Sequence, residues 1–189
     1  SMIVDIGGGT TEIAVIALGG IVTWKSLVTA GEEMTKNITQ YARDIFNLLI
    51  GERVAEDVKC RIGSTMDLGQ ALEIEMRGRY LLTGLPRQVV VHDGQIREAL
   101  YRSVQTIVEN IKATIEITPP ELVADIYERG IVLTGGGALL RGIEKTIARE
   151  TDIPVRVAED PLTCVVRGAG MLLDNEALLK DIALPTTGA

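Results

Sequence analysis

Three consecutive glycines near the start of the chain separate two strand-like segments and fix how the backbone must run there. Residues 2–4 are apolar and largely β-branched, and residues 12–16 alternate polar and apolar side chains, so both flanks predict β-strands. A hairpin turn at residues 7–9 must then join them. Glycine in this turn allows a positive φ and lets backbone N–H groups approach a ligand without obstruction. The segment therefore predicts either a plain hairpin or a hairpin that binds an anion.

A second run of glycines, Gly135-Gly136-Gly137, lies between a predicted buried strand at residues 131–134 and a predicted helix at residues 138–150. This order would place free backbone N–H groups at a helix N-terminus, where partial positive charge favours an anion. The run lacks the Lys-Ser/Thr pair of a Walker A loop, and Leu140 stands where a dinucleotide-binding fingerprint requires its third glycine. Anion binding and a purely structural strand-to-helix turn both remain open.

The periodicity of apolar residues gives the chain strand-rich ends and a more helical middle. A three-stranded meander is predicted over residues 3–28, and an α/β pattern returns at residue 118. The other predicted elements are helices at 31–50, 52–62 and 96–115, a partly exposed β layer at 64–92, a helix from a capping box at Thr118-Pro119-Pro120-Glu121 to Gly130, a strand at 153–158, and a last helix entered through Asp160-Pro161. We therefore expect residues 1–30 and 118–173 to share one sheet, with residues 31–117 inserted between them.

Composition and charge exclude several classes of function. The net charge of -7 and the pI near 4.8 argue against the basic surface that nucleic-acid binding needs. Hydrophobic residues make up 46% of the 189 residues, enough for a sizeable core, yet no apolar stretch is long enough to span a bilayer and no signal peptide is evident. Cys60, Cys164 and His92 lack metal-ligand spacing, so we expect no zinc site. These features predict a cytoplasmic protein.

Glu56 and Lys59 lie three residues apart on the predicted helix at 52–62, opposite its apolar stripe. They predict either a solvated ion pair, worth only ~0.3 kcal/mol, or two polar groups placed to hold a ligand. A further segment, Arg167-Gly168-Ala169-Gly170, gives the last helix a small-residue surface that another backbone can approach closely.

Together, these motifs resemble those of the actin, Hsp70 and sugar-kinase superfamily, in the same order along the chain. Asp5-Ile6-Gly7-Gly8-Gly9-Thr10-Thr11 is similar to its second phosphate motif, Gly135-Gly136-Gly137 to its adenosine motif, and Arg167-Gly168-Ala169-Gly170 to its second connecting helix. The segments GERVAEDVKCRIGS, RGRYLLTGLPR, PPELVADIYERGIVLTGGGALLRG and VAEDPLTCVVRGAG resemble the bacterial actin family MreB more specifically. The resemblance covers residues 2 to about 173, which is nearly the whole chain.

The resemblance implies an α/β fold with an actin-like (ribonuclease H-like) mixed sheet flanked by helices and an inserted smaller α+β subdomain. Subdomain IIA would comprise residues 1–30 and 118–173, and subdomain IIB would comprise residues 31–117. A C-terminal tail at residues 174–189 is expected to be disordered without the missing first domain.

The resemblance also implies a site for ATP or ADP with Mg²⁺. Its residues would be Asp5, Gly7, Gly8, Gly9, Thr10, Glu56, Lys59, Gly135, Gly136, Gly137 and Ala138. Asp5 would hold Mg²⁺ through water, and the amides of residues 7–10 would cradle the β- and γ-phosphates. Glu56 and Lys59 would grip the adenosine, while the turn at residues 135–138 would lie along the ribose and α-phosphate. The first glycine run then becomes a phosphate hairpin.

For function, the resemblance implies the second half of an MreB-like ATPase that forms filaments and maintains rod shape at the inner face of the bacterial plasma membrane. The other half would supply the carboxylate that positions the attacking water, so we expect no catalytic residue here and no hydrolysis by this half alone. Expected partners are ATP or ADP, further copies in a filament, and membrane-anchored cell-shape adaptor proteins, without nucleic acid or direct membrane contact. Two alternatives stay open: a fragment of an Hsp70-like or sugar-kinase-like phosphotransferase, and an actin-like adaptor that does not hydrolyse its nucleotide.

Overall fold

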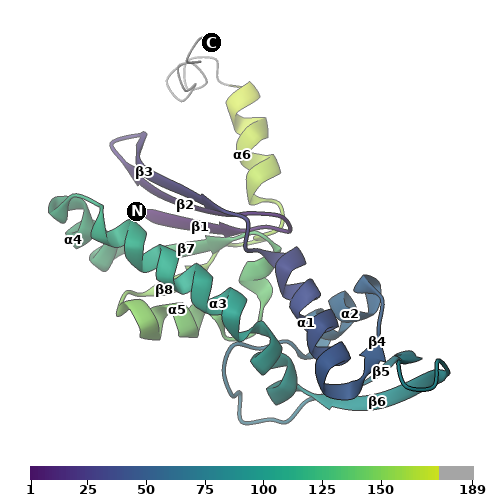
Figure 1. Ribbon diagram of the computed structural model, residues 1–189. Coiled ribbons are helices and arrows are strands. Elements are labelled where there is room, and N and C mark those ends of the chain that lie inside the picture. Colours follow the sequence, from purple (N-terminus) through teal and green to yellow (C-terminus); the bar gives the residue numbers. More distant parts are fainter. Residues whose placement is uncertain (175–189) are drawn as a thin grey trace, which may run out of the picture.

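The computed structural model describes residues 1–174, which form two β-sheets with helices packed around them (Figure 1). The strands are β1 (Met2–Ile6), β2 (Thr11–Ala17), β3 (Gly20–Leu27), β4 (Leu48–Leu49), β5 (Glu73–Tyr80), β6 (Pro86–His92), β7 (Ile131–Thr134) and β8 (Val155–Val157). The helices are α1 (Gly31–Phe46), α2 (Glu52–Ile62), α3 (Asp93–Glu116), α4 (Pro120–Arg129), α5 (Ile143–Thr151) and α6 (Cys164–Leu173), with a short 3-10 helix η1 (Gly136–Leu139). Apart from Asp174, the predicted tail at residues 174–189 lies outside the described residues.

The larger sheet is mixed, with the strand order β3-β2-β1-β7-β8. The central strand β1 pairs antiparallel with β2 and parallel with β7. Alternation along β1 turns Met2, Val4 and Ile6 into the core, and all three are fully buried. A mixed sheet flanked by helices, with a separate small antiparallel sheet, confirms the predicted fold class.

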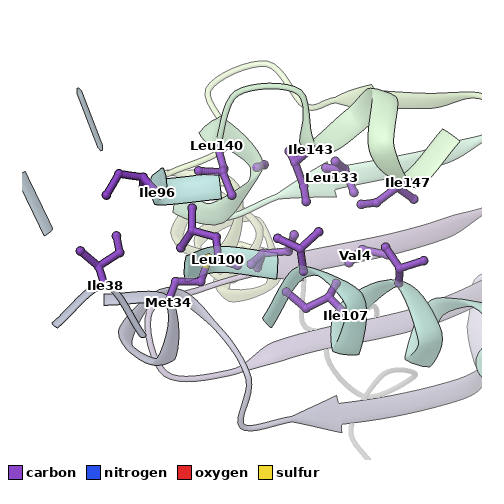
Figure 2. Close-up of a cluster of buried hydrophobic side chains, with 14 of the residues drawn as sticks. Val4, Met34, Ile38, Ile96, Leu100, Ile107, Leu133, Leu140, Ile143 and Ile147 are labelled. Atoms are coloured by element: carbon purple, nitrogen blue, oxygen red, sulfur yellow. The ribbon is translucent and has the colours of Figure 1, made fainter. Parts of the chain in front are cut away.

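Helix α3 joins both sheets to one hydrophobic core. Figure 2 shows Leu100 and Ile107 of α3 in the same buried cluster as Val4 and Leu133 of the large sheet and Met34 of α1. Helix α3 packs against β2 and β3 as well as against β6. It lies within the range predicted as the inserted subdomain yet also covers the large sheet, so the division into subdomains stays a proposal.

The smaller sheet has the strand order β4-β5-β6 and packs against α1 and α2. Its strands are all antiparallel. A side chain at Gly78 of β5 would clash with the backbone of Leu49. Glycine at this position therefore lets β4 lie close against β5.

The prediction of a helix over residues 31–50 is wrong at its C-terminal end. Helix α1 stops at Phe46, because Asn47 takes the left-handed conformation with φ of 51° and donates its N–H to the carbonyl of Ala42. Leu48 then pairs with Tyr80 in the small sheet and is fully buried. Leu48 has the spacing of a buried helix residue, but it is buried because it lies in a strand.

Two other predicted boundaries also need correction. Pro119, not Thr118, precedes the first residue of α4, and no side chain caps that helix. Thr118 instead donates its hydroxyl to the carbonyl of Thr114 at 2.7 Å, closing the end of α3. The strand predicted at 153–158 is limited to β8.

Helix α6 projects from the large sheet and buries none of its residues (Figure 1). Its exposed side chains include Val165, Val166, Met171 and Leu173. Among residues 1–174, none of the helices has both the length and the apolar character that crossing a membrane requires.

Candidate functional site

The first glycine run forms the turn between β1 and β2. Gly7 donates its N–H to the carbonyl of Thr10 at 2.9 Å, and a Cβ at Gly7 would lie 3.1 Å from the same oxygen. None of the three glycines has a positive φ, so that part of the reasoning from sequence is wrong. Gly8, Gly9 and Thr10 are exposed, and Gly9 has no heavy atom near the position that a Cβ would take. Their absent side chains leave the backbone open to a ligand.

The start of helix α1 is docked onto this hairpin. Gly31 and Glu32 donate their backbone N–H groups to the carbonyls of Gly7 and Gly8, at 3.1 and 2.8 Å. A side chain at Gly31 would press against the Gly7 carbonyl, at 3.2 Å. The first N–H groups of α1 therefore hold the hairpin in place.

The second glycine run packs directly over the end of β1. Gly135 has a φ of +80°, and a side chain there would clash with Asp5 and the backbone of Ile6. A side chain at Gly137 would clash with the side chain of Ile6. Thr134 donates its hydroxyl to Oδ1 of Asp5 at 2.9 Å. Asp5 therefore lies at the point where the two glycine turns meet.

The helix predicted to begin at residue 138 is absent at that place. Residues 136–139 form the 3-10 helix η1, and α5 begins only at Ile143, after Gly142 with its φ of 79°. The N–H groups of Ala138 and Leu140 are used within the turn, by the carbonyls of Gly135 and Gly137. The prediction of an α-helix N-terminus at this turn is therefore wrong.

Glu56 and Lys59 of α2 belong to a hydrogen-bonded network rather than to an isolated surface pair. Nζ of Lys59 lies 2.7 Å from Oε2 of Glu56, 2.8 Å from the carbonyl of Gly31 and 3.0 Å from Oγ1 of Thr35. Thr35 also hydrogen-bonds Oε2 of Glu56. The Lys59 side chain is only 12% exposed, whereas that of Glu56 is 50% exposed. Lys59 thus ties α2 to α1, and the Glu56 carboxylate keeps an open side.

The surroundings of Glu56 favour its charged form. Partial burial raises the pKa of Glu56, but hydrogen bonds from Lys59 and Thr35, with the positive charge of Lys59, outweigh burial and hold the pKa below its usual value. The thiol of Cys60 lies 3.5 Å from Oε1 of Glu56. Partial burial is the largest cause that raises the pKa of the Cys60 thiol, and the negative charge of Glu56 is the next. At neutral pH, Glu56 is therefore a charged carboxylate and Cys60 a neutral thiol.

The hairpin, the second glycine turn and α2 surround one cavity of about 540 Å³. Among the residues predicted for the site, those that line it are Gly7, Gly8, Glu56, Lys59, Gly136 and Gly137. Asp5, Gly9, Thr10, Gly135 and Ala138 do not line it: Asp5 is half-buried at the end of β1, Gly9 and Thr10 lie at the exposed hairpin tip, and Ala138 is buried behind the turn. The structure thus brings most of the predicted residues to a single cleft.

Sequence reasoning missed the apolar and polar walls that complete this cleft. The additional lining residues are Gly31, Glu32, Met34, Cys60, Gly63, Leu139, Leu140, Arg141 and Leu162. Leu162 reaches the cleft because the carbonyl of Pro161 accepts the N–H of Gly135 at 2.9 Å, which folds the segment after β8 against the turn. Leu139 is exposed although it stands in a segment whose pattern predicts a helix, so the sequence carried no signal for this apolar wall.

A divalent cation in this cleft would need oxygen atoms from a bound molecule in addition to those of the protein. Among residues 1–174, no three His, Cys, Asp or Glu side chains are grouped so as to hold a metal ion. Mg²⁺ usually keeps several waters and uses one or two carboxylates together with substrate phosphates. Glu32 lines the cavity beside Gly8, and Asp5 lies outside the lining at the end of β1, so either carboxylate could serve a cation of that kind.

Comparison with known proteins shows which proteins have a similar sequence and fold. The MreB/Mbl protein family matches residues 1–181. The cell shape-determining protein Mbl of Bacillus subtilis is 48% identical over 175 residues, which are 93% of this chain and 53% of Mbl. The chain therefore spans about half the length of the relatives it matches.

Solved structures agree with the sequence match. The crystal structure of MreB5 of Spiroplasma citri bound to AMPPNP superimposes with a TM-score of 0.89 at 36% identity, covering 95% of this chain and 54% of MreB5. The MamK double helical filament gives a TM-score of 0.75 at 26% identity, covering 93% of this chain and 54% of MamK.

Proposed function

This chain belongs to the MreB/Mbl protein family, and from that premise we propose that its cleft binds ATP and ADP. The observation that carries the proposal is the convergence of both glycine turns and the Glu56–Lys59 pair on one cavity of about 540 Å³. The similar MreB5 protein is a nucleotide-bound structure, which supports the proposal.

We assign the phosphates to the β1–β2 hairpin. Its tip, residues 8–10, is exposed, and Gly8 and Gly9 carry no side chain to keep a phosphate away from the backbone. Asp5 would hold Mg²⁺ through water beside this tip, and the cation would neutralise phosphate charge. Asp5 is kept in place by the hydroxyl of Thr134. Lys59 adds a positive charge to the same cleft.

We assign the adenosine to the space between α2 and the η1 turn. The open side of the Glu56 carboxylate can accept hydrogen bonds from sugar hydroxyls, and its lowered pKa keeps it charged. Met34, Leu139, Leu140 and Leu162 supply apolar surface for a base.

For the longer protein we propose ATP hydrolysis, filament formation and a role in cell shape. The relatives are named for cell-shape determination, and the similar MamK structure is a filament. The water-positioning carboxylate would come from a first domain, and the exposed apolar side chains of α6 suit packing against it. We further propose location at the inner face of the plasma membrane through membrane-anchored adaptor proteins. Family membership decides against the phosphotransferase alternative.

Phosphate release by the full-length protein tests hydrolysis against the adaptor alternative. We expect Mg²⁺-dependent release of phosphate from ATP, and we expect Asp5→Ala to lose most of that release. ATP binding without any phosphate release would favour the non-hydrolysing adaptor. Absence of ATP binding would refute the proposed function itself.

A further inference from the structure

Two segments that are far apart in sequence meet at the adenosine end of the cleft. Residues 63–66, which follow α2, lie against residues 140–142, which precede α5; we call this contact the seam. The N–H of Thr65 donates to the carbonyl of Arg141 at 2.9 Å, and Ser64 and Arg141 form a parallel bridge. The hydroxyls of Thr65 and Thr146 lie 2.7 Å apart. The seam thus connects the wall made by α2 to the wall made by the η1 turn.

The side chain of Arg141 adds a second connection across the seam. Its Nη1 donates to the carbonyl of Cys60 at 3.1 Å. Cys60 lies in the last turn of α2, where carbonyls lack partners within the helix and partial negative charge collects. A guanidinium is therefore well suited to this position, and Arg141 and Cys60 both line the cleft.

Two charged side chains tether helix α2 in addition to the contacts of the seam. Lys59 ties it to the start of α1 through the carbonyl of Gly31, and Arg141 ties its last turn to the segment after η1. The phosphate hairpin is fixed separately, by the backbone of Gly31 and Glu32. Loss of the Arg141 side-chain contact would therefore leave the hairpin fixed and weaken the connection at the adenosine end, where the backbone contacts of the seam remain.

We propose that Arg141 is a positioning residue that holds α2 and the η1 turn at the spacing that adenosine requires. This inference rests on the proposed function, because it assumes that the cleft binds a nucleotide. Binding to walls that are already held in place costs less ordering of the protein, so the contact raises affinity for the nucleoside without touching the phosphates.

The test compares Arg141→Met with Arg141→Lys in the full-length protein. Both variants keep an unbranched stem, but only lysine keeps a charged donor for the Cys60 carbonyl. Arg61→Met is the control, since Arg61 lies on the same helix in an exposed pair with Asp57 and does not line the cleft. Calorimetry with Mg²⁺ would measure dissociation constants for ATP and for inorganic triphosphate, which has no nucleoside.

We expect Arg141→Met to weaken ATP binding roughly fivefold, as for one lost hydrogen bond, and to leave triphosphate binding within about twofold. Arg141→Lys should restore most of the ATP affinity, and Arg61→Met should change neither ligand. Unchanged ATP affinity in Arg141→Met, or equal losses for ATP and triphosphate, would overturn the inference while the wild type still binds ATP. A wild type that binds triphosphate but gains nothing from the nucleoside would overturn it together with the proposed adenosine site.

Discussion

Lys59→Met tests whether Lys59 is a structural tie between α1 and α2 or one half of a surface ion pair. Methionine has nearly the length of lysine, so the substitution removes the ammonium and little else. The lost contacts are those of Nζ with Glu56, the Gly31 carbonyl and Thr35, at 2.7, 2.8 and 3.0 Å. The change therefore strips the carbonyl of Gly31 of a charged donor and leaves the Glu56 carboxylate without its cation.

The expected loss of stability follows from the exposure of each partner. A hydrogen bond to a charged group contributes roughly 1.5–3 kcal/mol, and breaking a fully buried ion pair costs about 3–5 kcal/mol. Lys59 is 12% exposed, but Glu56 is 50% exposed and regains water when its partner is lost. We therefore expect a loss of about 2 kcal/mol, well above the ~0.2–1 kcal/mol of an exposed pair. For a chain of this size, that corresponds to a drop in Tm of roughly 4–8 °C.

Urea unfolding followed by circular dichroism would measure this loss without any nucleotide. Arg61→Met is the matched control on the same helix, because the Arg61–Asp57 pair is exposed on both sides at 3.5 Å. We expect the control to lose under about 0.5 kcal/mol. Equal, small losses in both variants would refute the argument that Lys59 ties the two helices together.

Three further substitutions test other parts of the structure. A hydrogen bond from Arg97 holds the pKa of Asp93 below its usual value. The charged carboxylate therefore stabilises the fold above about pH 4, and this stabilisation is lost as the pH falls through the lower pKa of the folded state. The urea midpoint should accordingly decline less below pH ~4 in Asp93→Asn than in the wild type. Gly137→Ala should lower Tm by the equivalent of about 2 kcal/mol, because its methyl group would clash with Ile6. Leu48→Ala should cost about 2–5 kcal/mol in urea unfolding if Leu48 is buried in the small sheet, and little if it lies on an exposed helix end.

Periodicity in the sequence located elements well where one face is apolar and the ends are marked. Helix α2 has the bounds predicted for it, because Val54, Val58 and Ile62 form a regular stripe between Gly51 and Gly63. The end of α1 was missed because Leu48 fits the helical spacing and is buried for another reason, its pairing with Tyr80. Local pattern does not distinguish the two causes of burial.

The candidate site shows the same limit. Its glycine turns were recognisable from their flanking strands, but the need for glycine at Gly135 and Gly137 comes from Asp5 and Ile6, which are more than a hundred residues away in sequence. The position of the Lys59 side chain likewise depends on another helix, because its ammonium donates to the carbonyl of Gly31 in α1. Leu162 and Arg141 became part of the cleft only through hydrogen bonds that connect distant segments. Contacts between segments so far apart leave no recognisable pattern in the local sequence.

The most direct test of the central claim, that this cleft binds adenine nucleotides, is the dissociation constant of ATP and of GTP for the wild type, Glu56→Ala and Gly8→Val in the full-length protein. We expect the wild type to bind ATP more tightly than GTP. Glu56→Ala should lose about 1–3 kcal/mol of ATP binding, roughly five- to a hundredfold, because it removes the acceptor for the sugar hydroxyls. Gly8→Val should weaken both nucleotides alike, because its side chain obstructs the phosphates that they share. Unchanged affinities in both variants would contradict the claim and return Glu56 to a purely structural role.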